Sequence, residues 1–581
     1  MENNKKMICL CLVLTLAFAC LLAGCFQAKD RILAAESYTC EYGESYAVPF
    51  VTNIAGREAT VEIFDADGFE VMIEYGVCTL EKGEYTMVFT VGQLKKEVPL
   101  YCVDTTGPKI SITYTSSVAV GHWFTLPSAN ATDSGVVDKD MTKVALYKAG
   151  EDTPVLTTPG ERIKIENVAY YTLKATAADM DGNIGYFEEQ IEVIVRPESE
   201  VLQDFSEEVD PYWENTWGGG EPAFQWLAEF EGRQGVIAMG VDGAAYESGY
   251  GYAWWTDLGM DDLNLVGATG FTIKLRAQNC RMLSIKPGFS DSTIGVYGSH
   301  TFGIPYKQDE WVEVYVSLVN AGSLFSDMSK ATVAFCIAPE SGQNDICVWI
   351  DEVIVHYTPY EEYTVTVNDG TIDYKYDTVS AGRKVTVTHD ASKTPVGKVF
   401  SHYLCNGKRI WGNRVTITED SVLTPVYVDL VTEEKAIPEG AVLVTDFSTK
   451  SRYSASRSNC ITEWYATYEG VAGVLSIGLT EHNGYVLPDW TGILPLAFNF
   501  DPYTHVTFRM MVRKDAVEAL GIVVEGAIVT DLLGYVPDGN MTWVDVKIPV
   551  SQLKSLSIGL TNVVGTSGEM VWFDQIFATA E

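Results

Sequence analysis

Residues 226–232 read Trp-Leu-Ala-Glu-Phe-Glu-Gly, and residues 464–470 read Trp-Tyr-Ala-Thr-Tyr-Glu-Gly. Similar runs follow both after the same interval: residues 235–241 read Gly-Val-Ile-Ala-Met-Gly-Val, and residues 473–479 read Gly-Val-Leu-Ser-Ile-Gly-Leu. Self-similarity of this kind indicates that one structural unit occurs twice. The chain alternates apolar and polar residues over short runs and breaks at Gly, Pro, Asn or Asp, so the repeated unit is expected to be a β-sandwich.

Further landmarks recur in the same order in both copies. They are Asp204-Phe205 and Asp446-Phe447, Phe271–Leu275 and Val506–Met510, Trp311–Val314 and Trp543–Val546, and Val348–Asp351 and Val571–Asp574. We therefore place the copies at 198–358 and 436–581. The Asp-Phe opening, the late Trp-x-x-Val strand and the final strand with Asp resemble the galactose-binding-like jelly rolls found among carbohydrate-binding modules. The resemblance implies two jelly rolls.

The N-terminal part also alternates with a period of two, and helical periodicity is nearly absent from the chain. A Gly-Pro pair ends Asp104–Pro108 and marks a boundary between strand-rich segments at 37–104 and 105–197. The later segment ends with Ala178-Asp179, the turn Asp181-Gly-Asn183 and a closing strand. This order resembles the bacterial immunoglobulin-like domains of surface proteins. The earlier segment is expected to be a divergent immunoglobulin-like sandwich.

A smaller segment, 359–430, separates the two repeated units. It contains Gly397-Lys-Val-Phe400, the turn Asn406-Gly407 and a closing strand that ends at Tyr427. These features resemble the internalin-type B repeat, a small ubiquitin-like β-rich module, although Tyr403 stands where that family usually has Trp. The expected fold class is therefore all-β, a multidomain string of immunoglobulin-like and jelly-roll sandwiches with one such module.

The first 25 residues indicate export. Lys5 and Lys6 precede an apolar run over Met7–Leu22, which is too short to span a bilayer comfortably and is followed by Ala23-Gly24-Cys25. Leu22-Ala-Gly-Cys25 resembles the lipobox of bacterial lipoproteins, which implies a signal peptide over 1–25 and lipidation of Cys25. The alternative is an ordinary signal peptide with a chance cysteine. The expected location is the extracellular face of the bacterial cell membrane, with the lipid as anchor.

Length and charge narrow the class further. A chain of 581 residues is expected to form about four to six domains. The net charge of −38 argues against nucleic-acid partners, whose phosphates need a basic face. Eight cysteines follow Cys25 and are too scattered for a disulfide scaffold. Two alternatives remain. One is one or two disulfide bridges, among Cys40, Cys78 and Cys102 or between Cys336 and Cys347, and the other is free thiols.

Aromatic residues are the candidate ligand contacts, because sugar recognition needs flat apolar surface and a few orienting polar groups. Tryptophans that recur in both copies, such as Trp226 with Trp464 and Trp311 with Trp543, fit packing better than ligand contact. The candidate ligand-binding residues are the tryptophans that do not recur: Trp213, Trp217, Trp254, Trp255 and Trp490.

Catalytic patterns are hard to find, and no catalytic residue is predicted. The seven histidines lack metal-ligand spacing, and no nucleophile elbow or P-loop occurs. Alternation places Asp351 on one face with Trp349 and Val353, and Asp574 on the matching face. A half-buried carboxylate there requires backbone N-H donors or a cation, so structural calcium at Asp351 and Asp574 is one of two alternatives.

Acidic residues in the immunoglobulin-like segment raise the same question. Asp133, Asp179 and Asp181 could bind calcium, although capping a turn is the commoner role of Asp beside Gly and Asn.

The leading hypothesis is a non-catalytic lipoprotein that binds polysaccharide or a host glycan. A structural or adhesive protein with a protein partner is the alternative, followed by a jelly-roll carbohydrate-active enzyme. Exposed, coplanar tryptophans would favour the first.

Overall fold

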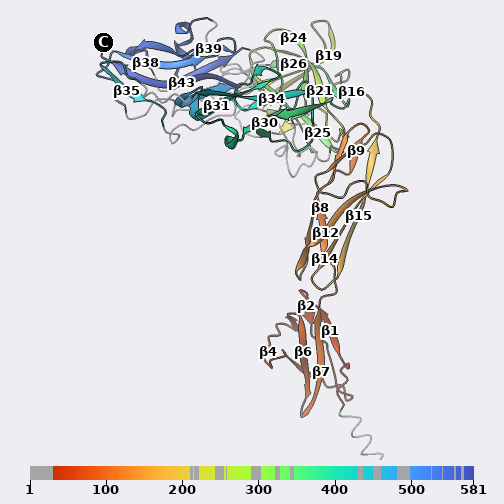
Figure 1. Cartoon of the computed structure of the whole chain (residues 1–581). Coiled ribbons are helices and arrows are strands. Elements are labelled where there is room, and N and C mark those ends of the chain that lie inside the picture. The colour runs from red at the N-terminus through yellow and green to blue at the C-terminus, as the bar shows by residue number, and fades with distance from the viewer. Residues whose placement is uncertain are drawn as a thin grey trace, which may run out of the picture. The chain divides into compact units, whose positions relative to one another are not determined.

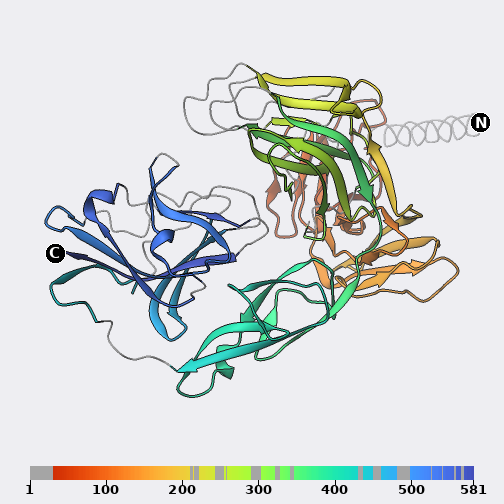
Figure 2. The same cartoon turned by 90° about the horizontal axis from the view of Figure 1, so that it is seen from above.

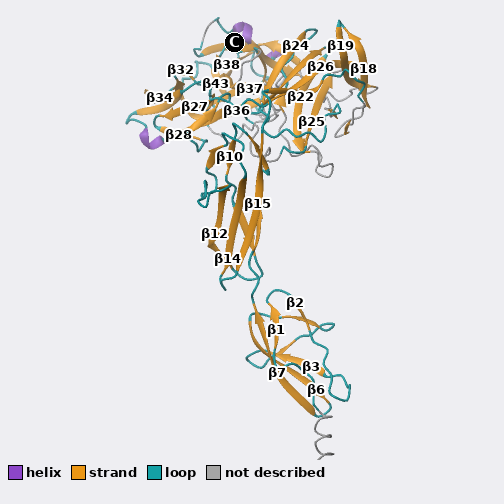
Figure 3. Cartoon of the chain, turned by 90° about the vertical axis from the view of Figure 1, so that its right-hand side faces the viewer, coloured by secondary structure: helices purple, strands orange, loops and turns teal. Residues whose placement is uncertain are grey.

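Strands are the dominant secondary structure of the computed structural model (Figure 3). It describes residues 31–580 except 210–212, 215–220, 243–253, 257, 290–301, 321–327, 340–345, 430–435, 449–459, 480–497, 525–526, 539–540, 555–557 and 564–567. Helix in this part is limited to single 3₁₀ turns: η3 (Ala391–Lys393), η4 (Leu533–Tyr535) and η5 (Val550–Gln552). The predicted all-β class is confirmed. No helix among the described residues has the length and apolar character needed to cross a membrane.

The chain divides into two compact units, residues 1–193 and 194–581. The first unit begins with a five-stranded sheet whose order is β1-β7-β6-β3-β4 (Figure 1). Its strands are β1 (Tyr38–Glu41), β7 (Leu94–Val103), β6 (Gly83–Val91), β3 (Thr60–Phe64) and β4 (Glu70–Val71). Strands β2 (Ser45–Ala47) and β5 (Val77–Thr79) pair separately. Strands β6 and β7 bury alternate apolar side chains, so one sheet face forms a core.

A four-stranded sheet, β12-β14-β15-β9, follows in the same unit. Its strands are β12 (Val137–Lys148), β14 (Tyr171–Asp179), β15 (Ile184–Ile194) and β9 (Ser117–Ala119). Two pairs complete the sandwich: β8 (Lys109–Ile112) with β11 (Ala129–Thr132), and β10 (Trp123–Thr125) with β13 (Arg162–Lys164). Alternate residues of β14 are buried, as its sequence predicts for a strand with one face on a core.

The second unit begins with a sandwich of two sheets, and Figure 2 shows its strands from above. One sheet has the order β18-β19-β26-β21-β24 with β16 also paired to β26, and the other has the order β17-β20-β25-β22-β23. The strands of the first are β16 (Ser199–Gln203), β18 (Glu221–Phe230), β19 (Arg233–Asp242), β21 (Gly270–Ala277), β24 (Trp311–Ser317) and β26 (Ile346–His356). The strands of the second are β17 (Trp213–Glu214), β20 (Trp254–Thr256), β22 (Cys280–Phe289), β23 (Phe302–Gly303) and β25 (Ala331–Pro339).

The C-terminal sandwich repeats this plan. Its larger sheet has the order β36-β37-β43-β38-β41 with β35 paired to β43, which corresponds strand for strand to the larger sheet of the first copy. These strands are β35 (Ala441–Thr445), β36 (Cys460–Tyr468), β37 (Val471–Leu479), β38 (His505–Val512), β41 (Val544–Pro549) and β43 (Gly568–Thr579). The smaller sheet, β40-β39-β42, contains β39 (Val517–Val524), β40 (Ala527–Asp531) and β42 (Ile558–Asn562).

The segment between the copies forms two small sheets. One has the order β29-β27-β34-β31-β32, and the other has the order β28-β30-β33. The strands are β27 (Glu362–Val367), β28 (Gly370–Ile372), β29 (Thr378–Ser380), β30 (Lys384–His389), β31 (Lys398–Cys405), β32 (Lys408–Arg409), β33 (Arg414–Thr416) and β34 (Ser421–Asp429). Tyr403 is buried and contributes to its core. We refer to residues 359–430 as the middle module.

A β-bulge corrects the predicted alternation in the closing strand of each copy. The pairing of β21 with β26 skips Asp351, and the pairing of β38 with β43 skips Asp574. An inserted residue shifts the alternation by one position. Trp349 therefore packs outside the main core, whereas Val353 lies within it, and the prediction that Trp349, Asp351 and Val353 share one face is wrong.

No disulfide joins the cysteines whose side chains the structure describes. Cys40 and Cys102 are paired across the parallel strands β1 and β7, and Cys336 and Cys347 lie on strands of different sheets. Burial raises the pKa of Cys40 and of Cys336 to about 12, so both are protonated at neutral pH.

Candidate functional site

Three of the predicted ligand-binding tryptophans belong to neighbouring strands at one edge of the smaller sheet of the first copy. Trp213 of β17 pairs with Thr256 of β20, and Glu214 pairs with Trp255. Strand β20 continues the pairing inward, with Trp254 opposite Ile337. The fold thus brings the strand of Trp213 beside the strand of a Trp-Trp pair that begins 41 residues later in the sequence.

The second copy does not offer this edge among the residues that the structure describes. Its sheet β40-β39-β42 corresponds to β23-β22-β25 of the first copy. The remaining predicted contacts, Trp217 and Trp490, lie outside the described residues, as does Cys25. For Trp213, Trp254 and Trp255 the structure describes the strands and their register.

Trp226 and Trp464 have the same packing role in the two copies. The indole N-H of Trp226 donates to the carbonyl of Phe205 at 2.8 Å, and that of Trp464 donates to the carbonyl of Phe447 at 2.7 Å. Both phenylalanines adopt a positive φ, and the glycine opposite Phe205, Gly235, leaves no space for a Cβ. The repeated tryptophans therefore fix a strained turn, which explains their repetition without a ligand.

The outer face of the larger sheet carries an aromatic cluster in the first copy. Phe230 stacks on Trp349 at 5.4 Å between ring centroids, and Trp311 lies beside Phe230. The guanidinium of Arg233 lies 4.3 Å from the ring centroid of Trp311, and that of Arg276 lies 5.1 Å from Trp349. Arginine side chains thus cover these rings and keep them as packing residues.

The corresponding face of the second copy receives a turn of the middle module. Trp411, from the turn after β32, contacts the fully buried Trp572 with ring centroids 5.6 Å apart. Tyr468 stacks on Trp572, with ring centroids 5.4 Å apart. Arg409 donates to the Tyr468 hydroxyl at 3.0 Å and forms an ion pair with Glu469. Sequence reasoning did not identify this contact.

A buried carboxylate, Glu569, lies at the same interface. It is 2% exposed and accepts hydrogen bonds from the hydroxyls of Tyr465 and Ser476. Burial raises the pKa of Glu569 above its ordinary value, although the two hydroxyls oppose the shift. The register places Ile346 at the equivalent position of the first copy. A charged residue at a position that is apolar in the other copy was the available sequence signal.

The predicted metal residues each face an arginine. Asp351 forms an ion pair with Arg233, and Oδ2 of Asp574 lies 3.1 Å from Nε of Arg509. The Asp351 side chain is 17% exposed and that of Asp574 is 5% exposed. Charge compensation by arginine from the same sheet was not among the two alternatives drawn from the sequence. Calcium at either residue stays a prediction.

These features define the class of protein: a multidomain all-β chain of sandwiches, with one sandwich plan present twice. No protein-family model matches the chain, and no curated protein matches it. Among solved structures, the chain is similar to carbohydrate-binding modules from the β-sandwich superfamily, with 16% identity and a TM-score of 0.19 over 43% of this chain and 98% of that chain.

Two further solved structures are similar over different shares of the chain. Fibronectin(III)-like modules of Clostridium thermocellum CbhA match at 15% identity and a TM-score of 0.13, over 28% of this chain and 95% of that chain. The structure of the M60 catalytic domain with the CBM51-1 and CBM51-2 domains of Clostridium perfringens ZmpB matches at 11% identity and a TM-score of 0.15. The match covers 90% of this chain and 52% of that chain. The all-β class rests on the strands themselves.

Proposed function

We propose that this chain is a non-catalytic glycan-binding lipoprotein of the bacterial cell surface, with its ligand site on the first copy of the repeated sandwich. The observation that carries the proposal is the placement of Trp213, Trp254 and Trp255 on β17 and β20, the two neighbouring strands at one edge of the smaller sheet. Tryptophans are suited to covering the C-H face of a pyranose.

The surface location is part of the same proposal. It is supported by the basic residues Lys5 and Lys6, the apolar run and the Leu22–Cys25 motif. A lipid on Cys25 would tether the sandwiches outside the cell, where polysaccharide and host glycans are available. The acidic charge of −38 fits neutral or basic glycans better than polyanionic ones.

Glycan-array binding tests the proposal with the chain that follows the signal peptide. We expect saturable binding. Because consecutive residues of a strand point to opposite faces of the sheet, Trp254→Ala or Trp255→Ala should weaken binding about tenfold or more while leaving the melting temperature nearly unchanged. Trp123→Ala is the matched control, because Trp123 is an exposed tryptophan of the N-terminal unit that stacks with Arg162. It should leave glycan binding unchanged.

Three outcomes would overturn this function or its ligand site. If Trp254→Ala and Trp255→Ala unfold the sandwich, the rings are packing residues and the ligand surface is elsewhere. If the wild-type chain binds no glycan but adheres to protein-coated surfaces, the adhesive alternative replaces the glycan-binding one. Hydrolysis of an arrayed glycan would instead favour the carbohydrate-active enzyme.

A further inference from the structure

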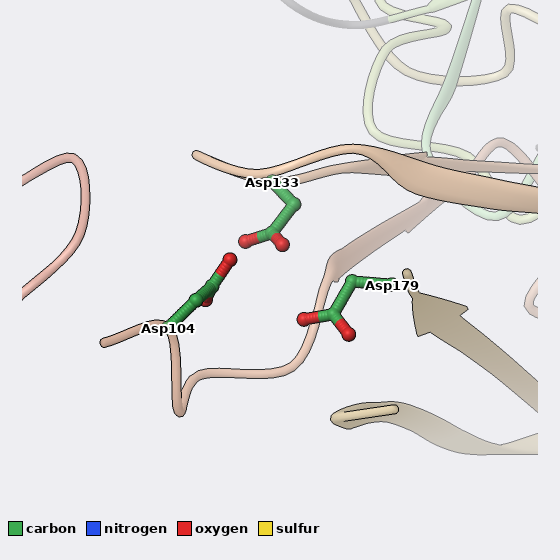
Figure 4. Close-up of side chains that lie close together, drawn as sticks. All are labelled: Asp104, Asp133 and Asp179. Carbon is green, nitrogen blue, oxygen red and sulfur yellow. The ribbon is translucent and has the colours of Figure 1, made fainter. Parts of the chain in front are cut away.

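Three aspartates converge where the two sandwiches of the N-terminal unit meet. Figure 4 shows the side chains of Asp104, Asp133 and Asp179 directed toward one another. One carboxylate oxygen of each lies within 4.8 Å of the others. Three carboxylates at this spacing repel one another strongly unless a positive charge lies among them.

The fold brings the aspartates together from separate elements. Asp104 follows β7 of the first sandwich, Asp133 follows β11 of the second, and Asp179 ends β14. Asn183 ties two of them, because its Nδ2 donates to the Asp104 carbonyl at 2.9 Å and to Oδ2 of Asp179 at 2.8 Å. A Cβ at Gly135 would lie 2.4 Å from Oδ2 of Asp104, so a larger residue there would displace the Asp104 carboxylate.

Burial makes this cluster different from a solvated acidic patch. Asp104 is 8% exposed, and its side chain is 0% exposed. Oδ1 of Asp104 and Oδ2 of Asp133 have no hydrogen-bond donor among the described residues. A buried carboxylate oxygen without a donor costs free energy, and it marks a place for a ligand that supplies positive charge.

Asp179 combines two roles. Its Oδ1 accepts from the backbone N-H groups of Asp181 and Asn183, both at 2.9 Å, so it caps the turn as its sequence context suggested. Burial opposes ionisation, but these hydrogen bonds lower the pKa of Asp179. The carboxylate is therefore charged at neutral pH, and its geometry is fixed by the turn.

One lysine reaches the site and compensates only part of its charge. Nζ of Lys82 lies 2.9 Å from Oδ2 of Asp104 and also forms an ion pair with Asp181. Asp104, Asp133, Asp179 and Asp181 carry four negative charges against the single positive charge of Lys82, which leaves a local charge of −3. The Lys82 side chain is 34% exposed, so it can move into solvent without a large cost.

We propose that Asp104, Asp133 and Asp179 bind a calcium ion that links the two N-terminal sandwiches. Calcium prefers oxygen ligands and accepts flexible geometry, and carbonyls and waters commonly complete its shell of six to eight oxygens. Because Asp104 belongs to the connection between the sandwiches, the ion stiffens that connection. Lys82 competes for Asp104 and occupies the site when calcium is scarce. The proposal is independent of glycan binding.

Calcium titration by isothermal calorimetry tests this site in the full chain after the signal peptide. The chain should carry Asp351→Asn and Asp574→Asn, so that these other candidates do not contribute heat. We expect one calcium per chain, with Asp104→Asn and Asp133→Asn each reducing the affinity at least tenfold. Lys82→Gln should increase the affinity, because it removes the competing ammonium. Glu188→Gln, an exposed carboxylate of the same sandwich paired with Lys174, is the matched control.

Thermal unfolding separates a lost ligand from a damaged fold. In chelator, Asp104→Asn should raise the melting temperature, since it removes repulsion from the cluster. In millimolar calcium the same variant should melt below the parent, because the parent alone gains stability from the ion. Absence of calcium binding by the parent, unchanged affinity in Asp104→Asn, or weaker binding by Lys82→Gln would each overturn the proposal.

Discussion

At the scale of single residues, the buried charges show how the two copies of the repeated sandwich diverged. Glu569 replaces the apolar Ile346, and Ser476 replaces Ala238, at positions that the shared register makes equivalent. The hydroxyls of Tyr465 and Ser476 supply hydrogen bonds that a carboxyl group needs in a buried place. Trp411 of the middle module contacts Trp572 on this face of the second copy.

Glu569 makes stability depend on pH. An acid whose pKa is raised in the folded state binds more protons there than in the unfolded state, so its contribution to stability is complete below the unfolded pKa of about 4.3 and is lost as pH rises through the folded pKa. The Glu569→Gln variant should therefore have the same melting temperature as the wild type at pH 4 and a higher melting temperature at pH 7. Calorimetry between pH 4 and 8 measures the difference. A variant less stable at pH 7 would contradict the raised pKa.

The bulge residues Asp351 and Asp574 carry the remaining calcium prediction. If calcium binds there, chelation should lower the melting temperature of each sandwich, and Asp351→Asn or Asp574→Asn should remove that response from its own copy only. Differential scanning calorimetry with chelator and with millimolar calcium measures this. If the melting curves with chelator and with calcium coincide, Arg233 and Arg509 alone compensate the charges of the two aspartates.

At the scale of elements, each larger sheet has two faces with different roles. The inner faces form the main cores, and the outer faces carry small aromatic clusters. The outer cluster of the first copy is covered by arginine side chains, while that of the second copy is covered by a tryptophan from another module. Equivalent tryptophans therefore differ in burial, and their contributions to stability should differ as well.

Truncation of one tryptophan from each outer cluster, Trp572 of β43 and Trp311 of β24, measures the effect of this cover. Trp572→Ala removes a fully buried ring and should cost about 3–5 kcal/mol of unfolding free energy. Trp311→Ala removes a half-buried ring at the edge of the other cluster and should cost only about 1–2 kcal/mol, less than its repetition in the sequence suggested. Denaturant titration measures both values. Equal losses would mean that arginine cover is as effective as burial under the module.

At the scale of the whole molecule, the middle module and the second sandwich share an interface. Trp411 and Arg409 of the module pack on Trp572, Tyr468 and Glu469 of the sandwich. Residues 436–581 alone would expose this aromatic face to water. The fragment contains its own core and should fold, but its stability should depend on the module.

Comparison of two fragments tests that dependence. Residues 359–581 should melt in one transition and at a higher temperature than residues 436–581, and Trp411→Ala in the longer fragment should remove most of the gain. Calorimetry provides the measurement. If 436–581 alone melts at the same temperature, the contact contributes little and the module is a spacer.

Anchoring is the prediction that involves the chain as a whole. Cys25→Ala should abolish lipid attachment and release the protein or leave it unprocessed, because the sequence after residue 25 contains no other long apolar run. Labelling of cells with a radioactive fatty acid measures the attachment. Incorporation into the Cys25→Ala protein would show that another residue carries the lipid.

The sequence by itself determined the strand class and the existence of a repeated unit, because alternation and turn residues are local properties of the chain. It also showed that some tryptophans recur in both copies, as Trp226 and Trp464 do, which separates them from the candidate ligand contacts. Only the tertiary structure decided the faces and the partners. A single inserted residue at Asp351 or Asp574 reverses the side on which later side chains point, and a bulge of this kind has no reliable sequence signature. The pairing of Trp213 with the Trp254 strand, the contact of Trp411 with Trp572 and the convergence of Asp104 with Asp179 join residues that are distant in sequence, and such contacts depend on how strands order within sheets.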